Sequence, residues 1–330
     1  MPEKRRLTPE YIASMCERAF PDRPNQQIAE VRILNSRQHE VTSFELWWFT
    51  PDGITDHEDL IARRYVSTVS WWRPDDRGKA QRETTVTRWL GETGFPVPKV
   101  YTREFGAYGD VVLFARLPND DPIGRSSRPL SETIVPYIEP FAQRLAELHS
   151  LSPPDEVRRV LPWVTLPGAV ANLFAVASQL HIPELTEAID GLMSRAYDVQ
   201  ETEPVVIHGD YHFLNALMKD GQITGIIDWE YCALADPRWD VANVYSQLVD
   251  FGAPQAANQF LQLYMAQTDT QFGGPPLYNV VAPLQQWTIS EWIVQQTSDG
   301  DEPGFGMAAE LITLRDVHKR RALRALQMLD

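Results

Sequence analysis

The sequence has few cysteines and no long apolar segment. Cys16 and Cys232 are the two cysteines among 330 residues, which is too few for a disulfide framework, and their spacing fits no metal site. No apolar run approaches the roughly 20 residues that span a membrane, and the N-terminus lacks the apolar centre of a signal peptide. We therefore expect a cytoplasmic protein that makes no membrane contact.

Positive charge is also scarce. Thirty lysines and arginines stand against 45 aspartates and glutamates, so the net charge is −15. Such a surface repels a polyanion over most of its area, which argues against a nucleic acid partner, and it attracts a small cation. The hydrophobic share of 43% is enough for a globular interior, and the length exceeds that of one ordinary core, so we expect two lobes.

One segment carries most of the chemical signal, and it runs from Val205 to Asp240. Its sequence is VVIHGDYHFLNALMKDGQITGIIDWEYCALADPRWD. The pattern predicts a strand at 205–207 and a hairpin of strands 217–219 and 223–227 around the turn pair Asp220-Gly221. Polar loops then lie at the open end of that hairpin.

Three side chains in these loops suit phosphoryl transfer. Asp210 can accept a proton from an attacking hydroxyl, while Asn215 and Asp228 offer the hard oxygen ligands that magnesium prefers. The spacing H-x-D-x-x-x-x-N, followed by a strand that ends in Asp, is the layout of the catalytic and metal loops of kinases. This chemistry needs a positioned hydroxyl and cations on the phosphates.

The segments HGDYHFLN and IIDWEYCALADPRWD resemble the aminoglycoside phosphotransferase and choline kinase family, relatives of the protein kinases. The resemblance implies ATP or GTP as phosphate donor and Mg²⁺ as cofactor. It implies that Asp210 is the catalytic base and that Asn215 and Asp228 hold the metal. His208, Asp236 and Asp240 are then supporting residues that brace the loops. One departure is Ala235, where the family usually has glycine.

Two other functions fit parts of the sequence. His208, Asp210 and His212 alternate like the ligands of a metal-dependent hydrolase. A catalytically inactive, kinase-like nucleotide-binding protein is the other alternative, because the expected turn between the first two strands, SRQHEV at 36–41, has no glycine. In kinase-like small lobes this turn covers the phosphates and is often glycine-rich.

The N-terminal part reads as a small β-rich lobe. A helix is predicted at 8–20, strands at 28–34, 41–50 and 60–66, and a helix at 79–92. By the resemblance, the third strand presents a cation to the phosphates. Arg63 and Arg64 are the candidates, and since neighbours on a strand point to opposite faces, only one can serve. Glu83 would orient that cation.

The chain then leads into a helical lobe. A buried strand is predicted at 111–117, and by the resemblance the backbone of Phe114, Ala115 and Arg116 would meet the nucleotide base. The composition of 118–129 indicates a linker, so we place the nucleotide-binding lobe at 1–118 and the helical lobe, with the catalytic and metal loops and the acceptor pocket, at 119–330. Helices are predicted at 138–149, 168–180, 184–197, 240–251, 255–267, 278–297 and 305–329.

The predicted fold is thus a bilobal, protein-kinase-like α+β fold. The resemblance implies a small-molecule kinase that moves the γ-phosphate to a hydroxyl of a small acceptor. Glu230, just after Asp228, could contact a cationic acceptor or serve as an ordinary loop carboxylate. The identity of the acceptor and the oligomeric state cannot be predicted from this sequence.

Overall fold

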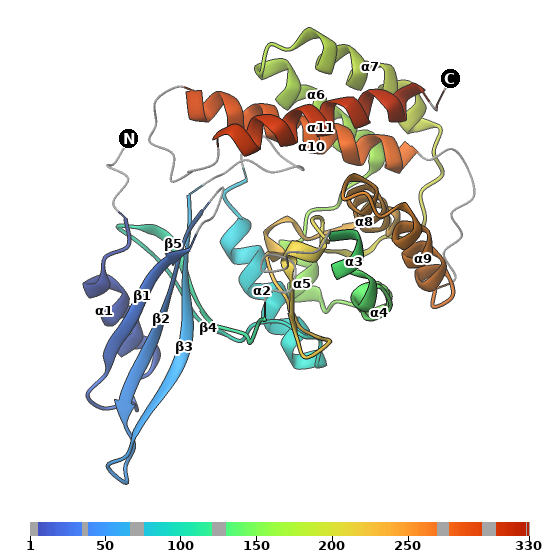
Figure 1. Ribbon diagram of the computed structural model, residues 1–330. Helices are drawn as coiled ribbons and strands as arrows, with labels where there is room; N and C mark the ends of the chain where they lie inside the picture. The colour runs from blue at the N-terminus through green and yellow to red at the C-terminus, as the bar shows by residue number, and fades with distance from the viewer. Residues whose placement is uncertain are drawn as a thin grey trace.

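The computed structural model describes residues 6–34, 39–66, 76–120, 130–268, 277–298, 308–327 and 329. Parts of the expected turn at 36–41 and of the linker at 118–129 lie outside these residues, as does the start of the last predicted helix. Figure 1 shows a twisted sheet beside a larger group of helices, so the two-lobed α+β architecture predicted from the sequence is confirmed.

The small lobe is built on one antiparallel sheet in the order β1-β2-β3-β5-β4. Residue 63 is opposite Val41 on one side and Val112 on the other, so it lies on the central strand. The strands are β1 (Gln27–Leu34), β2 (His39–Phe49), β3 (Thr55–Tyr65), β4 (Val100–Gly106) and β5 (Gly109–Ala115).

Helix α1 (Pro9–Ala19) covers one face of this sheet. The hydroxyl of Thr8 accepts a hydrogen bond from the N–H of Tyr11 and caps the helix, with Pro9 in the first turn, as the sequence predicts. The helix buries Ile12 and Met15 against apolar side chains of β2 and β3. These contacts form a separate small core.

Helix α2 (Lys79–Thr93) lies between the sheet and the large lobe (Figure 1). Its apolar residues Val86, Trp89 and Leu90 belong to the same buried cluster as Phe141 and Ile226 of the large lobe. Gly94, with φ of 85°, ends the helix in a left-handed cap. The small lobe therefore attaches to the large one through a shared core as well as through the chain after β5.

The large lobe is mostly helical and surrounds two small pairs of strands. β6 pairs with β9, and β7 with β8, both antiparallel. The strands are β6 (Val205–Ile207), β7 (Ala216–Lys219), β8 (Gln222–Ile226) and β9 (Ala233–Ala235). The helices are α3 (Leu130–Thr133), α4 (Ile138–Ser150), α5 (Asp155–Val160), α6 (Leu166–Gln179), α7 (Pro183–Tyr197), α8 (Arg238–Asp250), α9 (Pro254–Met265), α10 (Leu277–Ser298) and α11 (Ala308–Gln327).

The predicted elements are present, with end positions shifted by a few residues, and some elements were not predicted. β4, which follows the prolines Pro96 and Pro98, was not predicted, and neither were the short elements β9, α3 and α5. β3 starts at Thr55, earlier than predicted, because it pairs with the full length of β2. Among the described residues, no helix is both long and apolar enough to cross a membrane.

Candidate functional site

Two loops of the large lobe meet at the ends of the strand pairs. We call residues 208–215 the HGD loop and residues 228–232 the DWE loop. β6 leads into the HGD loop, and β8 leads into the DWE loop, which ends at β9. The N–H of Ile227 donates to the carbonyl oxygen of Asn215 at 2.9 Å. The hairpin therefore places Asn215 next to the start of the DWE loop.

Asp240 on α8 holds the start of the HGD loop. Its carboxylate accepts hydrogen bonds from the backbone N–H groups of His208 at 2.7 Å and Gly209 at 2.8 Å, and it is fully buried. Nε2 of His149, on α4, lies 3.3 Å from the same carboxylate. This is the bracing arrangement expected for Asp240, and His149 is a buried partner of that brace.

Both ring nitrogens of His208 form hydrogen bonds with backbone groups. Nε2 donates to the carbonyl oxygen of Ile227 at 3.0 Å, and Nδ1 accepts from the N–H of Asp210 at 3.2 Å. Burial lowers the pKa of His208, although nearby carboxylates oppose this shift. The side chain thus ties the HGD loop to the residue before Asp228, and neither ring nitrogen is left for a metal.

This arrangement argues against the hydrolase alternative, which needs His208 as a ligand. No group of three histidines, cysteines, aspartates or glutamates that could hold a metal ion occurs in the described parts of the chain. His212, the third residue of that alternative, accepts from the N–H of Leu214 through Nδ1, and its Nε2 lies 3.4 Å from Oδ2 of Asp210. It is a neighbour of Asp210 and not of His208 in the described contacts.

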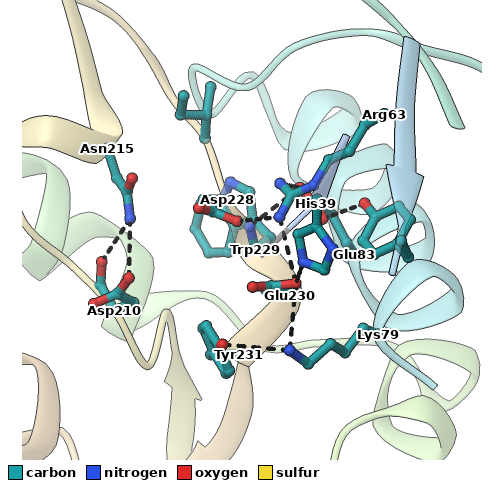
Figure 2. Close-up of polar contacts among 12 residues, drawn as sticks. His39, Arg63, Lys79, Glu83, Asp210, Asn215, Asp228, Trp229, Glu230 and Tyr231 are labelled. Atoms are coloured by element: carbon teal, nitrogen blue, oxygen red, sulfur yellow. Dashed lines mark hydrogen bonds and ion pairs between the residues drawn. The ribbon is translucent and has the colours of Figure 1, made fainter. Parts of the chain in front are cut away.

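Asp210 and Asn215 lie side by side, as Figure 2 shows. Nδ2 of Asn215 donates to the backbone oxygen of Asp210 at 3.0 Å and lies 3.4 Å from its Oδ2. Burial would raise the pKa of Asp210, but His212 and His208 hold it below its usual value. Asp210 is therefore present as a carboxylate at neutral pH, the form that can accept a proton.

Asp228 lies between this pair and the small lobe in the view of Figure 2. Its φ of 72° and ψ of 51° are left-handed, an uncommon conformation for a residue other than glycine. Oδ1 is 2.6 Å from Nη2 of Arg63, and the side chain keeps 31% exposure. The loop thus turns sharply at Asp228 and leaves its carboxylate partly exposed, with Arg63 of the small lobe as its partner.

The oxygen donors fit a magnesium ion. Asn215 turns its Nδ2 to Asp210, which leaves its amide oxygen for another partner, and Asp228 adds a half-buried carboxylate. Amide and carboxylate oxygens are hard ligands of the kind that Mg²⁺ takes. Asn215 and Asp228 are therefore the residues that could hold the ion.

Of the two arginines on β3, Arg63 faces the site and Arg64 does not. Arg63 lies 3.2 Å from Glu83 and 2.6 Å from Asp228, and these carboxylates hold its pKa well above the usual value although burial opposes them. Arg64 points to the other face, where Nε donates to Glu40 at 2.8 Å. Strand alternation predicts this split, and the register of β3 decides which residue faces inward.

Glu83 on α2 connects Arg63 to the DWE loop. Oε1 accepts from Arg63 at 3.2 Å and from the N–H of Trp229 at 3.3 Å, and Oε2 accepts from the hydroxyl of Tyr65. Burial raises the pKa of Glu83 to about 7, against the influence of Arg63. Glu83 therefore contacts both Arg63 and the backbone of the DWE loop, and its role in orienting a cation for the phosphates stays a prediction.

Glu230 is not turned to an acceptor pocket. Its side chain is 3% exposed, and Oε2 contacts Nε2 of His39, Nη2 of Arg63 at 3.3 Å and Nζ of Lys79 at 3.7 Å. Burial would raise the pKa of Glu230, but His39, Lys79 and Arg63 hold it well below its usual value. The suggested acceptor contact is therefore replaced by a buried contact with the small lobe.

His39 and Lys79 were missed by the sequence analysis. His39 is the first residue of β2, and Lys79 is the first residue of α2. Neither belongs to a local motif, and 191 residues separate His39 from Glu230. The sequence around each residue therefore gave no signal for this contact.

Asp236 supports the start of α8. Its carboxylate accepts from the N–H of Arg238 at 2.9 Å, from the Arg238 side chain, and from the N–H of Thr202 at 2.8 Å. The helix begins at Arg238, two residues before the range of 240–251 predicted from the sequence. Asp236 is thus a structural residue beside the site and contacts neither Asp210 nor Asp228 in the described bonds.

The segment after β5 is fastened to the β7–β8 hairpin. The N–H groups of Ala115 and Arg116 donate to the carbonyl oxygens of Lys99 and Asp59, and Phe114 is buried. A Cβ on Gly225 would lie 2.1 Å from Cδ1 of Leu117. The strand β8, which contains Gly225, therefore packs directly against the connection between the lobes. The N–H groups of Ala115 and Arg116 are thus already used, which leaves other backbone atoms of this segment for a base.

Comparisons with known proteins agree with this geometry. The model of the family described as "Phosphotransferase enzyme family" matches residues 41–276, more than half of the chain. Hygromycin-B 4-O-kinase of Escherichia coli is 23% identical over 180 residues, which is 50% of this chain and 51% of that protein. The chain thus matches about half the length of this curated relative.

Solved structures share the fold across nearly the whole chain. Aminoglycoside phosphotransferase APH(4)-Ia, in a complex with AMP-PNP and hygromycin B, has a TM-score of 0.63 at 14% identity and covers 96% of this chain and 98% of its own. Ethanolamine kinase of Plasmodium vivax has a TM-score of 0.62 at 12% identity, covering 96% and 89%. These likenesses confirm the kinase-like fold, and together with the family match they show that the chain belongs to the phosphotransferase enzyme family.

Proposed function

We propose that this protein transfers the γ-phosphate of ATP or GTP to a hydroxyl group of a small molecule. The observation that supports this most strongly is the meeting of the HGD and DWE loops. Asp210 lies beside Asn215, and Asn215 is bonded through its backbone to the residue before Asp228. Arg63 joins the carboxylates of Glu83 and Asp228 from the opposite lobe.

Each of these residues has one role in the proposed reaction. Asp210 accepts the proton of the acceptor hydroxyl, whose oxygen forms a bond to the γ-phosphorus while the bond to the β,γ-bridging oxygen breaks and the nucleoside diphosphate leaves. Arg63 places positive charge near the phosphates, and Glu83 keeps it oriented. Asn215 and Asp228 would hold Mg²⁺, which when bound neutralises charge on the phosphate oxygens.

We further propose that the acceptor carries an amine. The net charge of −15 favours cationic ligands. Structural relatives include complexes with hygromycin B and with kanamycin, and an ethanolamine kinase. The division into a nucleotide-binding lobe at 1–118 and an acceptor-binding lobe at 119–330, and a cytoplasmic location, stay predictions within this proposal.

The test is nucleotide turnover with a panel of acceptors. The purified chain is given ATP or GTP and Mg²⁺ with hygromycin B, kanamycin, ethanolamine, choline or glucose, and phosphorylated product is measured by mass spectrometry. Product that requires both Mg²⁺ and an amine-bearing acceptor is expected. Tight nucleotide binding without turnover of any acceptor would instead support the inactive nucleotide-binding alternative. Turnover of glucose alone would refute the proposal that the acceptor carries an amine.

A further inference from the structure

A buried hydrogen bond joins the start of β2 to the DWE loop. His39 and Glu230 have side chains that are 1% and 3% exposed, and Nε2 of His39 contacts Oε2 of Glu230. Nδ1 of His39 accepts from the N–H of Val66, just after β3, at 3.2 Å. This second bond fixes the ring proton on Nε2, so the neutral imidazole donates to Glu230.

The hydrogen bond from His39 to Glu230 also bears on which carboxylates Arg63 contacts. Arg63 lies within reach of three carboxylates, at 3.2 Å from Glu83, 2.6 Å from Asp228 and 3.3 Å from Glu230. A buried carboxylate without enough donors draws the nearest cation toward itself. Because His39 donates to Glu230, Arg63 can stay between Glu83 and Asp228 (Figure 2).

The backbone of the DWE loop is held from the same side. Arg82 donates through Nε to the carbonyl oxygen of Glu230 at 3.0 Å, and its guanidinium pairs with Asp76 at 2.6 Å. Two residues earlier, Asp228 has the left-handed φ of 72°. Such a conformation persists when neighbouring contacts fix it. The next two residues, Trp229 and Glu230, are both held through backbone and side chain, and the side chain of Glu230 is held by His39.

We propose that His39 is a positioning residue for the site: through Glu230 it holds the DWE loop and keeps Arg63 directed at Asp228 and the nucleotide phosphates. The expected effect on nucleotide binding rests on the proposed function, whereas the expected effect on the loop rests on the geometry alone. It assigns to the first residue of β2 a contact with the large lobe, and this contact connects β2 to the loop that carries Asp228.

Two substitutions separate the bonds of His39. His39→Gln places an amide N–H near the position of Nε2, so it can still donate to Glu230, whereas His39→Asn places an amide oxygen near Nδ1 and can serve Val66 only. His57→Gln is the matched control, since His57 is a histidine of the same sheet that stacks on Trp47 and is exposed. All variants are first compared by thermal unfolding.

Two measurements then test the proposal. The affinity for Mg²⁺ and AMP-PNP is measured by calorimetry, and amide hydrogen exchange of residues 228–232 is measured on the nucleotide-free chain. For His39→Asn we expect the affinity to be about tenfold weaker and the amide exchange to be about tenfold faster. A tenfold change corresponds to the loss of one hydrogen bond to a charged group. His39→Gln and His57→Gln should stay close to the unchanged chain in both.

A double-mutant cycle with Glu230→Gln checks that the effect passes through Glu230. In that background, His39→Asn should change the affinity by less than about twofold, because the partner charge is gone. Equal behaviour of His39→Gln and His39→Asn, or additive effects in the cycle, would overturn the proposal. Absence of nucleotide binding by the unchanged chain would refute the proposed function instead, and the exchange rates would still decide the role of His39.

Discussion

The backbone of Gly209 lies directly against the carbonyl group of Tyr231. A Cβ atom on Gly209 would lie 2.3 Å from the carbonyl oxygen of Tyr231, and the φ of Gly209 is 81°. The HGD and DWE loops therefore touch at a point where a side chain has no room. The glycine of the HGD motif is needed here for close approach as well as for its backbone conformation.

Replacing Gly209 should accordingly cost more stability than replacing a glycine in open space. Gly221 is the matched control, since its φ is 76° and nothing lies within 4 Å of its Cβ position. For Gly221→Ala we expect a loss of about 1 kcal/mol from the left-handed conformation alone. Gly209→Ala should lose at least about 2 kcal/mol more, because the clashing atoms belong to the backbone. Urea unfolding of both variants measures the difference, and equal losses would show that the two loops are farther apart.

Asp210→Asn should remove transfer and leave nucleotide binding nearly unchanged. The amide cannot accept the hydroxyl proton, and loss of a general base costs about 10²–10⁴-fold in rate. In Figure 2, Asp210 and Asn215 lie on one side of Asp228 and Arg63 lies on the other, so the arginine proposed to contact the phosphates keeps its place. Single-turnover transfer and AMP-PNP affinity are measured, with Asp52→Asn at an exposed turn as control. Transfer at the rate of the unchanged chain would refute the role of Asp210 as base.

Arg63 and Arg64 should behave differently although they are neighbours. Arg63→Ala removes the charge beside Glu83 and Asp228, and we expect KM for the nucleotide to rise about ten- to a hundredfold, the range for a lost charged hydrogen bond. Arg64→Ala removes a contact with Glu40 on the other face of the sheet and should leave KM almost unchanged. Steady-state kinetics in nucleotide decide between them. A larger effect from Arg64→Ala would mean that the wrong face of β3 has been assigned to the nucleotide.

The parts of the site that could be predicted from sequence are the local ones. The separation of Asp210 from Asn215 and the turn at Asp220-Gly221 are fixed by a few consecutive residues, so the hairpin and both loops follow from short-range rules. Helix starts were predictable for the same reason, as at Thr8 with Pro9. Local geometry of this kind needs no knowledge of distant segments.

The contacts that tie the lobes together could not be predicted in this way. The partner of Glu230 is His39, far away in sequence, and the sequence left Glu230 as either an acceptor contact or a loop carboxylate. The choice between Arg63 and Arg64 depends on which face of β3 meets α2, and alternation along the strand alone does not fix that. β4 was missed because its residues Thr102, Arg103 and Glu104 are polar and follow a proline-rich stretch.

Stability should also depend on pH through Asp250, at the end of α8. Burial raises the pKa of Asp250 to about 6, against the influence of Arg321 on α11, which donates to it. An unfolded aspartate titrates near about pH 4, so the folded chain holds an extra proton between the two values. The contribution of Asp250 to stability is therefore full below about pH 4 and is lost as the pH rises to about 6.

Asp250→Asn tests this, because the amide mimics the protonated acid at every pH. Relative to the unchanged chain, the free energy of unfolding of the variant should increase by on the order of 2 kcal/mol between about pH 4 and 6 and stay level above about pH 7. The attraction between Arg321 and the ionised carboxylate is already included in the pKa of about 6, so it adds no further pH dependence. Urea unfolding at several pH values gives the curve, with Asp52→Asn as the baseline for an exposed carboxylate. A difference that does not vary with pH would show that Asp250 keeps an ordinary pKa in the folded chain.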